Sequence, residues 1–239
     1  MNFRVKKNTV KYFLYILLQF SATGLFAQSQ TMILSYEDFV QLRQKEAPSK
    51  GYLNISDISG SPYLNRAFRK GSVLTNQKIK YVNIPLRYNI FSDAMEFKDA
   101  KGEPMEIKFP EDIREISIGD TVFVYHSYFA DHKIRKGYFQ LLNRGKAQGL
   151  LRYRVEFQKA QPAGAYKEPM PPRFVPAPLL LYVSIDGQPA VEIHKTKALM
   201  ALLGDHPKEL QAYVKKHKIK LHRAKDLKKL LEYYNTLTK

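Results

Sequence analysis

A two-residue alternation of apolar and polar side chains runs through residues 72–160. Apolar residues occupy every second position in several short segments, which include Ile84, Leu86, Tyr88 and Ile90, then Met105, Ile107 and Phe109, then Leu151, Tyr153, Val155 and Phe157. Successive side chains of a strand point to opposite faces, so this period predicts strands with one buried face and one face in water. Turn-forming residues interrupt the segments at 99–102, 119–120 and 143–145. We therefore predict an antiparallel β domain over residues 72–194.

The order of these segments favours a meander, because strands that follow one another in the chain tend to pair. The strands would form either a sandwich or a partly closed barrel. Pro85 lacks a backbone N–H, which predicts an edge strand or a bulge at that point. Six prolines within 161–178 predict an extended connector. The Asp186–Gly187 pair, between two apolar segments, predicts a tight hairpin.

Helical patterns flank the β domain on both sides. Ser35 precedes Asp38 by three residues, which is typical of a capping box, so residues 28–71 are predicted to hold a helix that ends before Pro48 and then a loop. After residue 195 the apolar spacing lengthens, and Gly204 is expected to end a first helix. We expect Asp205 to cap a second helix, 218–222 to be extended, and 227–234 to lie in a third helix. The predicted fold class is α+β, with a helical tail over 195–239.

The first 27 residues have the three parts of a secretory signal. Four cations and no acid open the chain, an apolar stretch follows at 12–20, and small residues precede Ala27, where cleavage is expected. The apolar stretch is shorter than the approximately 20 residues of a membrane span, although an uncleaved N-terminal anchor is the alternative. We predict export by a cleaved signal peptide to the periplasm or the outer membrane, with secretion also open.

Several chemical functions are excluded or disfavoured by residue usage. The chain has no cysteine, which removes disulfides, thiolate catalysis and cysteine-based metal sites. No serine-nucleophile or phosphate-loop motif is present. His126, Asp131 and His132 offer two imidazoles and a carboxylate that could bind zinc or nickel if their loop folded back, but their spacing matches no metal motif. We therefore predict a non-enzymatic protein with no cofactor.

Positive charge is concentrated at the C-terminal end. The formal net charge is +17, and the last 45 residues carry twelve Lys and Arg against four Asp and Glu. Six cations with no intervening acid lie within 215–225: Lys215, Lys216, Lys218, Lys220, Arg223 and Lys225. This run predicts a solvated face, and contact with an anionic membrane surface or another polyanion is the alternative. Sparse aromatic residues nearby argue against a nucleic-acid partner.

Two stretches resemble known sequences. The stretch from Gly71–Thr75 through Tyr81–Phe97, and the tail from Lys195 to Asn235, are similar to segments of uncharacterised exported proteins of the Bacteroidota. The resemblance implies a location in the periplasm or the cell envelope, and it implies no activity.

These observations predict an exported, non-enzymatic cell-envelope protein that acts by binding or scaffolding an unknown partner. The alternative is a periplasmic carrier of a lipid or another apolar ligand held in the cup of the β-sheet. A hollow cup would favour the carrier, and a filled core would favour partner binding.

Overall fold

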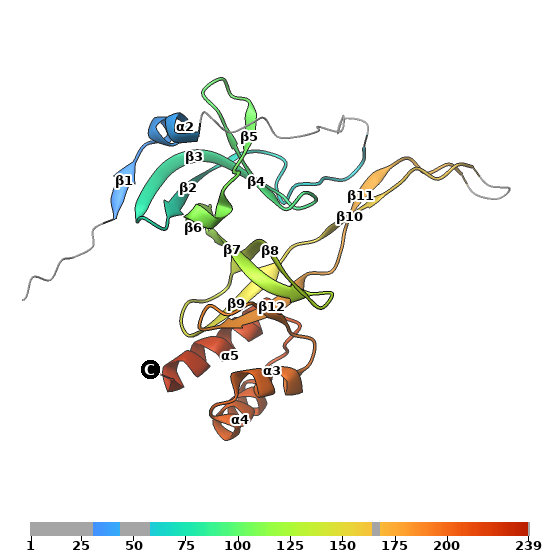
Figure 1. The fold of residues 1–239 in the computed structure, drawn as a ribbon. Coiled ribbons are helices and arrows are strands. Elements are labelled where there is room, and N and C mark those ends of the chain that lie inside the picture. The colour runs from blue at the N-terminus through green and yellow to red at the C-terminus, as the bar shows by residue number, and fades with distance from the viewer. Residues whose placement is uncertain (1–30, 44–57, 164–167, 239) are drawn as a thin grey trace, which may run out of the picture. The chain divides into compact units, whose positions relative to one another are not determined.

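A computed structural model describes residues 31–43, 58–163 and 168–238. The predicted signal peptide at 1–27 and the expected end of the first helix before Pro48 lie outside these ranges. Eleven strands of the described residues form one sheet, and its order is β13–β12–β9–β8–β7–β6–β2–β3–β4–β5, with β1 (Met32–Leu34) parallel to the start of β3. Neighbours in this order are antiparallel, which confirms the predicted α+β fold with an antiparallel meander (Figure 1).

The sheet consists of two meanders joined by one return. The first meander contains β2 (Arg69–Thr75), β3 (Ile79–Asn89), β4 (Ala94–Lys98) and β5 (Pro104–Glu106). After the short 3-10 helix η2 (Pro110–Asp112), the chain returns to the free side of β2. The second meander contains β6 (Ile113–Ile118), β7 (Thr121–Ala130), β8 (Lys133–Leu141) and β9 (Ala147–Arg152), and β12 (Leu180–Ile185) and β13 (Val191–Glu192) extend it.

The first half of the sheet curls around a common core. Tyr88 on β3 and Tyr138 on β8 are four strand spacings apart, which is about 19 Å in a flat sheet. Their ring centroids are 5.9 Å apart, and Phe123 of β7 lies 5.4 Å from Tyr88. Curling is therefore what brings the apolar positions of the first meander and of β6–β8 into one core.

Helix α2 (Tyr36–Arg43) packs on β3. Ser35 and Asp38 form the predicted capping box: the Ser35 N–H donates to the Asp38 carboxylate at 2.8 Å, and the Asp38 N–H donates to the Ser35 Oγ at 3.3 Å. The helix directs the fully buried Phe39 onto Tyr81 and Phe97, at centroid distances of 5.3 and 5.0 Å. The inner face of the sheet is packed with side chains at this point.

Pro85 lies next to a bulge, which is one of the two alternatives predicted for it. The β2–β3 register shifts beside Asn83, whose φ of 59° lies in the left-handed region. Strand β3 as a whole is interior to the sheet. Among the described residues, however, neither β1 nor β4 pairs with residues 82–85, and the missing N–H leaves no gap in a ladder on that side.

The proline-rich segment differs from the predicted connector. Its second half forms β11 (Arg173–Pro176), which pairs with β10 (Val155–Gln158) in a separate two-stranded sheet, and Gln161 pairs with Met170. The continuous alternation expected over 151–157 is therefore divided between β9 and β10. Figure 1 shows this hairpin projecting from the main sheet. At its base, Phe174 of β11 contacts Phe91 of the β3–β4 turn with ring centroids 5.2 Å apart.

The hairpin between β12 and β13 has the predicted turn. Asp186 and Gly187 have φ values of 50° and 73°, and the Gln188 N–H donates to the Ile185 carbonyl at 2.9 Å. Positive φ at both central residues is the geometry that an Asp–Gly pair favours.

Three helices form a unit that packs on β9 and β12 (Figure 1). They are α3 (Thr196–Leu203), α4 (Pro207–His217) and α5 (Ala224–Leu237). Gly204 ends α3 at a φ of 64°, as predicted. The apolar face of α5, with Leu227, Leu230, Leu231 and Tyr234, is fully buried, which confirms the third predicted helix. No helix among the described residues is long and apolar enough to cross a membrane.

Two expectations for the helical unit are wrong. Asp205 does not cap α4: His206 occupies the N-cap position in a left-handed conformation, and the Asp205 carboxylate lies 3.5 Å from the Lys146 Nζ. Residues 218–222 form a turn, because Lys218 is left-handed and ends α4. The apolar Leu221, which suggested an extended segment, is buried against the helices.

Asn235 of α5 ties the helices to the sheet. Its side-chain oxygen accepts the Ala147 N–H at 2.8 Å, and its amide nitrogen donates to the carbonyls of Arg144 and Ala147 at 3.1 and 2.9 Å. Gly145, at a φ of 126°, passes so close to Asn235 that a Cβ would collide with it.

The two halves of the sheet meet at a narrow junction. Strands β8 and β9 pair at Gln140–Leu151 and Leu141–Leu150, and the Leu142 N–H just beyond them donates to the Gly149 carbonyl at 2.8 Å. A polar cluster lies beside this junction and is centred on Asp93 of the β3–β4 turn.

The Asp93 carboxylate accepts three hydrogen bonds in this cluster. The donors are the Tyr88 hydroxyl at 2.7 Å, the Arg152 Nη2 at 2.9 Å and the Tyr138 N–H at 3.2 Å. Both members of the ion pair are mostly buried, with 23% of the Asp93 side chain and 17% of the Arg152 side chain exposed. Gly137 of β8 makes this approach possible, since a Cβ there would overlap both charged groups. We call this arrangement the Asp93–Arg152 clamp.

Candidate functional site

A polar groove opens where β6 and β7 separate. The two strands pair next to their turn, from Ile116–Phe123 to Ile118–Thr121, and within the described chain no pairing continues beyond that point. The groove has a volume of about 440 Å³, which is within the range of ligand sites. Its lining consists of Asn76, Glu111, Ile113, Arg114, Glu115, Val124, Tyr125, His126, Leu141, Arg144, Gly145 and Gln148.

A bulge at Arg114 accounts for the separation. On the β2 side, Leu74 pairs with Glu115 and Thr75 pairs with Ile113, so Arg114 is the extra residue of β6. A bulge bends its strand and disrupts pairing locally, and such features are frequent beside functional sites. Asn76 fixes the far wall of the groove, because its side chain donates to the Glu111 carbonyl at 2.6 Å.

The groove exposes a strand edge. Three consecutive residues of β6 and three of β7 line it. Consecutive side chains point to opposite faces of a sheet. A groove lined by consecutive residues therefore lies along the edges of the two strands and not over one face of the sheet.

The backbone of Tyr125 points into this groove. The Tyr138 N–H, directly opposite Tyr125, points away from β7 to Asp93, and so 125–138 is a non-hydrogen-bonded pair of the β7–β8 ladder. Further along β7, the Ser127 carbonyl and the Phe129 N–H point away from β8 and bind Ala190. Both observations put the N–H and C=O of Tyr125 on the groove side. The β6–β7 ladder ends at Ile116–Phe123, so this edge of Tyr125 lies beyond the described pairing of the two strands.

Two acidic and two basic residues line the groove: Glu111, Glu115, Arg114 and Arg144. The guanidinium of Arg144, from the β8–β9 loop, forms a two-point ion pair with Glu115, in which Nη2 lies 2.7 Å from Oε2. Hydrogen bonding to Arg144 lowers the pKa of the Glu115 carboxyl, so this carboxylate stays ionised. Glu111 lies 3.8 Å from the Lys136 Nζ. A groove whose lining carries no net charge, bordered by β7 beyond the end of the β6–β7 ladder, suits a polar ligand of low net charge.

The histidine constellation considered from the sequence does not converge. His126 lies within β7, where its Nδ1 is 2.7 Å from the Ser127 carbonyl, and Asp131 and His132 form the turn between β7 and β8. Five residues along a strand separate His126 from Asp131, which is about 17 Å. In the described ranges no group of three His, Asp or Glu residues is placed to hold a metal ion.

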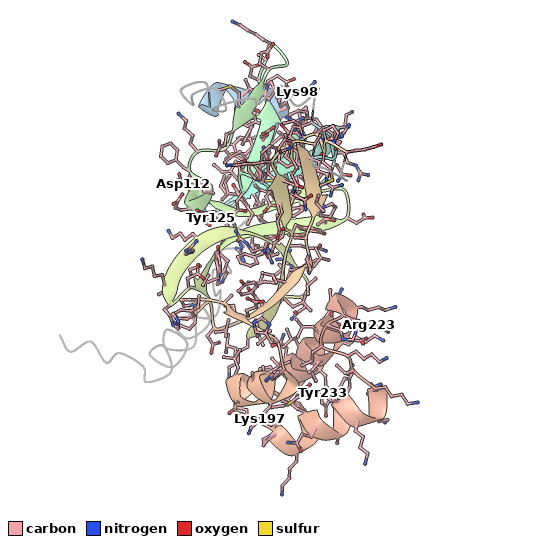
Figure 2. The ribbon with its side chains drawn as sticks, turned by 90° about the vertical axis from the view of Figure 1, so that its right-hand side faces the viewer. Lys98, Asp112, Tyr125, Lys197, Arg223 and Tyr233 are labelled. Atoms are coloured by element: carbon pink, nitrogen blue, oxygen red, sulfur yellow. The ribbon has the colours of Figure 1, made fainter. Side chains whose placement is uncertain are left out.

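The six predicted polyanion contacts lie together on the helical unit. Lys215 and Lys216 are in the last turn of α4, Lys218 and Lys220 are in the following turn, Arg223 is the N-cap of α5, and Lys225 is in its first turn. All six are exposed, and within the described residues none forms an ion pair with an acid. Figure 2 shows Arg223 in the helical unit and Asp112 and Tyr125 on the β6–β7 side of the sheet.

The chain was compared with protein-family models, curated proteins and solved structures. None of the three comparisons found a match. The resemblance to exported Bacteroidota proteins therefore stays a prediction, and the case for a functional site depends on geometry.

The sequence prediction did not identify the β6–β7 groove. A signal for it exists at 113–118, where the polar residues Arg114 and Glu115 are adjacent and break the two-residue alternation. An extra residue in an alternating strand is the sequence signature of a bulge. The partners from the β8–β9 loop, Arg144 and Gln148, lie far away in sequence and carry no comparable signal.

Proposed function

We propose that this protein is an exported cell-envelope protein that binds a partner protein, and that the β6–β7 groove is the binding site. The observation that supports this proposal most directly is the Tyr125 backbone, whose N–H and C=O face the groove beyond the end of the β6–β7 ladder. Unpaired backbone groups of a strand edge are a ready template for another polypeptide. The proposed role is binding or scaffolding, without catalysis.

The packing of the cup favours a partner protein over a lipid. Phe39 occupies the cup between Tyr81 and Phe97, and all three are buried. A cavity beside Leu86 and Phe123 has a volume of about 30 Å³, which has no room for an acyl chain. Native mass spectrometry of the protein purified from envelopes tests the alternative directly. We expect the mass of the protein alone, and a stoichiometric lipid would favour the carrier.

Site-specific crosslinking tests the proposed binding site. A photoreactive amino acid at His126 should form a discrete adduct in envelope fractions, whereas the same amino acid at the exposed Lys101, in the β4–β5 turn, should not. Excess unlabelled protein should compete for the adduct, and a Gln148→Trp variant with a filled groove should not compete. Equal adducts at both positions, or equal competition, would contradict the proposal.

Export has its own test. The intact mass of the purified protein should correspond to a chain that begins at Gln28. A chain that still begins at Met1 would rule out cleavage.

The cationic helical unit supports a second contact, with the anionic surface of a membrane. Six exposed cations without acidic partners lie together, and each basic residue near such a surface contributes about 1 kcal/mol. We propose that this unit holds the protein at the envelope while the groove binds the partner.

A further inference from the structure

We infer that the β6–β7 groove takes a polypeptide segment in extended conformation, which adds as a strand to the Tyr125 edge of β7. The inference rests on the proposed function and specifies its partner as a strand, as opposed to the surface of a folded domain. Three features of the groove carry it: the Tyr125 backbone groups that face it beyond the β6–β7 ladder, the length of this opening, and the use of the same edge of β7 elsewhere in this chain.

The backbone pair supplies the recognition chemistry. In strand addition, main-chain hydrogen bonds give most of the affinity, and alternate side chains give specificity. A residue of an incoming strand opposite Tyr125 can accept the Tyr125 N–H and donate to the Tyr125 carbonyl. The paired Arg144 and Glu115 present no net charge to this segment.

The size of the opening fits a short segment. Residues 124–126 of β7 border the groove, and three residues of a strand span about 10 Å. The incoming segment cannot extend past Phe123 toward the β6–β7 turn, because β6 already pairs with β7 there.

The chain itself binds an extended segment at the next stretch of this edge. Ala190, just before β13, lies parallel to Tyr128. Its N–H donates to the Ser127 carbonyl at 2.8 Å, and its carbonyl accepts the Phe129 N–H at 2.9 Å. The proposed ligand would use the same edge of β7 next to this contact, with both of its hydrogen bonds made to Tyr125.

The test uses the full mature chain and a displayed library of random twelve-residue peptides. Peptides enriched on the wild-type protein are synthesised, and their binding is measured by fluorescence anisotropy. Replacing Tyr125 by its α-hydroxy acid exchanges only the N–H for an oxygen, and we expect affinity to fall about fivefold to tenfold, the effect of one hydrogen bond. Gln148→Trp, which fills the groove without changing the β7 backbone, should abolish binding.

Tyr36 provides a matched control for the backbone exchange. It is the first residue of α2, where the N–H has no partner within the helix. The same α-hydroxy acid at Tyr36 should leave peptide affinity unchanged. Thermal melts of all variants establish that each is folded, and Gln148→Trp keeps the test decisive if the Tyr125 ester unfolds the protein.

Several results would overturn the inference. Peptides that bind the wild type and Gln148→Trp equally, or a library that yields no binder, would do so. If His126 forms a crosslinked adduct but no peptide binds, the proposed function stands, and the partner presents a folded surface to the groove and not an extended strand. A concentration-dependent dimer that Gln148→Trp prevents would identify a second copy of this chain as the occupant.

Discussion

The Asp93–Arg152 clamp should be the most stabilising polar interaction of the junction between β8 and β9. Asp93→Ala removes the acceptor for Arg152, Tyr88 and the Tyr138 N–H and leaves the guanidinium mostly buried without its counter-ion. Breaking a buried ion pair costs about 3–5 kcal/mol. Because about a fifth of each side chain is exposed, we expect the low end, about 3 kcal/mol.

Urea denaturation followed by circular dichroism measures this loss. For a chain of this size, about 3 kcal/mol corresponds to a fall in the melting temperature of roughly 6–12 °C. The double variant Asp93→Ala/Arg152→Ala should be more stable than the two single changes added together, because the pair contributes a coupling of about 1–3 kcal/mol.

A second ion pair gives a matched control. Asp131 and Arg135, at the β7–β8 turn, lie 2.8 Å apart, nearly the 2.9 Å of the clamp, but their side chains are 78% and 53% exposed. Asp131→Ala should therefore change stability by less than about 1 kcal/mol. If Asp93→Ala is equally mild, or if the coupling in the double variant is zero, then burial at the junction does not strengthen the clamp.

Three further predictions concern other parts of the molecule. Burial, with a contribution from Glu192, raises the pKa of Tyr182 to about 12. The folded protein therefore keeps a proton that the unfolded chain releases near pH 10, so the free energy of unfolding falls from pH 10 to 12. In Tyr182→Phe the urea midpoint should fall less over this range. An equal fall in the variant and the wild type would mean that Tyr182 is not the group responsible. Asn235→Ala should cost about 1–3 kcal/mol in urea unfolding, because it removes the acceptor of the Ala147 N–H at the buried helix–sheet contact, while Asn143 still donates to the Ala147 carbonyl. A change below about 0.5 kcal/mol would mean that water replaces the side chain. Replacing the six cations of 215–225 by Gln should lower the affinity for phosphatidylglycerol vesicles, measured by sedimentation, more than about tenfold. If the wild type does not bind, or if its binding does not depend on salt, these cations form only a solvated face.

The sequence predicted the local elements of this fold well, because their causes are local. The alternation at 84–90, the Ser35–Asp38 capping box and the Asp186–Gly187 turn each depend on residues a few positions apart. The predictions for 205 and 218–222 were wrong for a different reason. Asp205 binds Lys146 across the helix–sheet contact, and Leu221 is buried by tertiary packing, and neither partner is visible in a local pattern.

The candidate site could be predicted only in part. The adjacent polar residues Arg114 and Glu115 indicate a break in β6, but the position of β7 relative to that break depends on the curl of the sheet. The partner of Glu115, Arg144, comes from a loop 29 residues later. The choice between sandwich and barrel likewise depended on packing, because alternation specifies which face is buried and not what covers it.

The narrow pairing of β8 with β9 has a mechanical consequence. A pulling force between the first strands and the C-terminal helices is carried by the short β8–β9 pairing, the Ala190 contact, the Asp93–Arg152 clamp and the Arg144–Glu115 ion pair. The core of the first strands and the core between the sheet and the C-terminal helices each contain many buried side chains. Unfolding under force should therefore begin at the β8–β9 junction and leave both halves folded. Single-molecule extension should then show two successive steps, and loosening the clamp should lower the force of the first step alone.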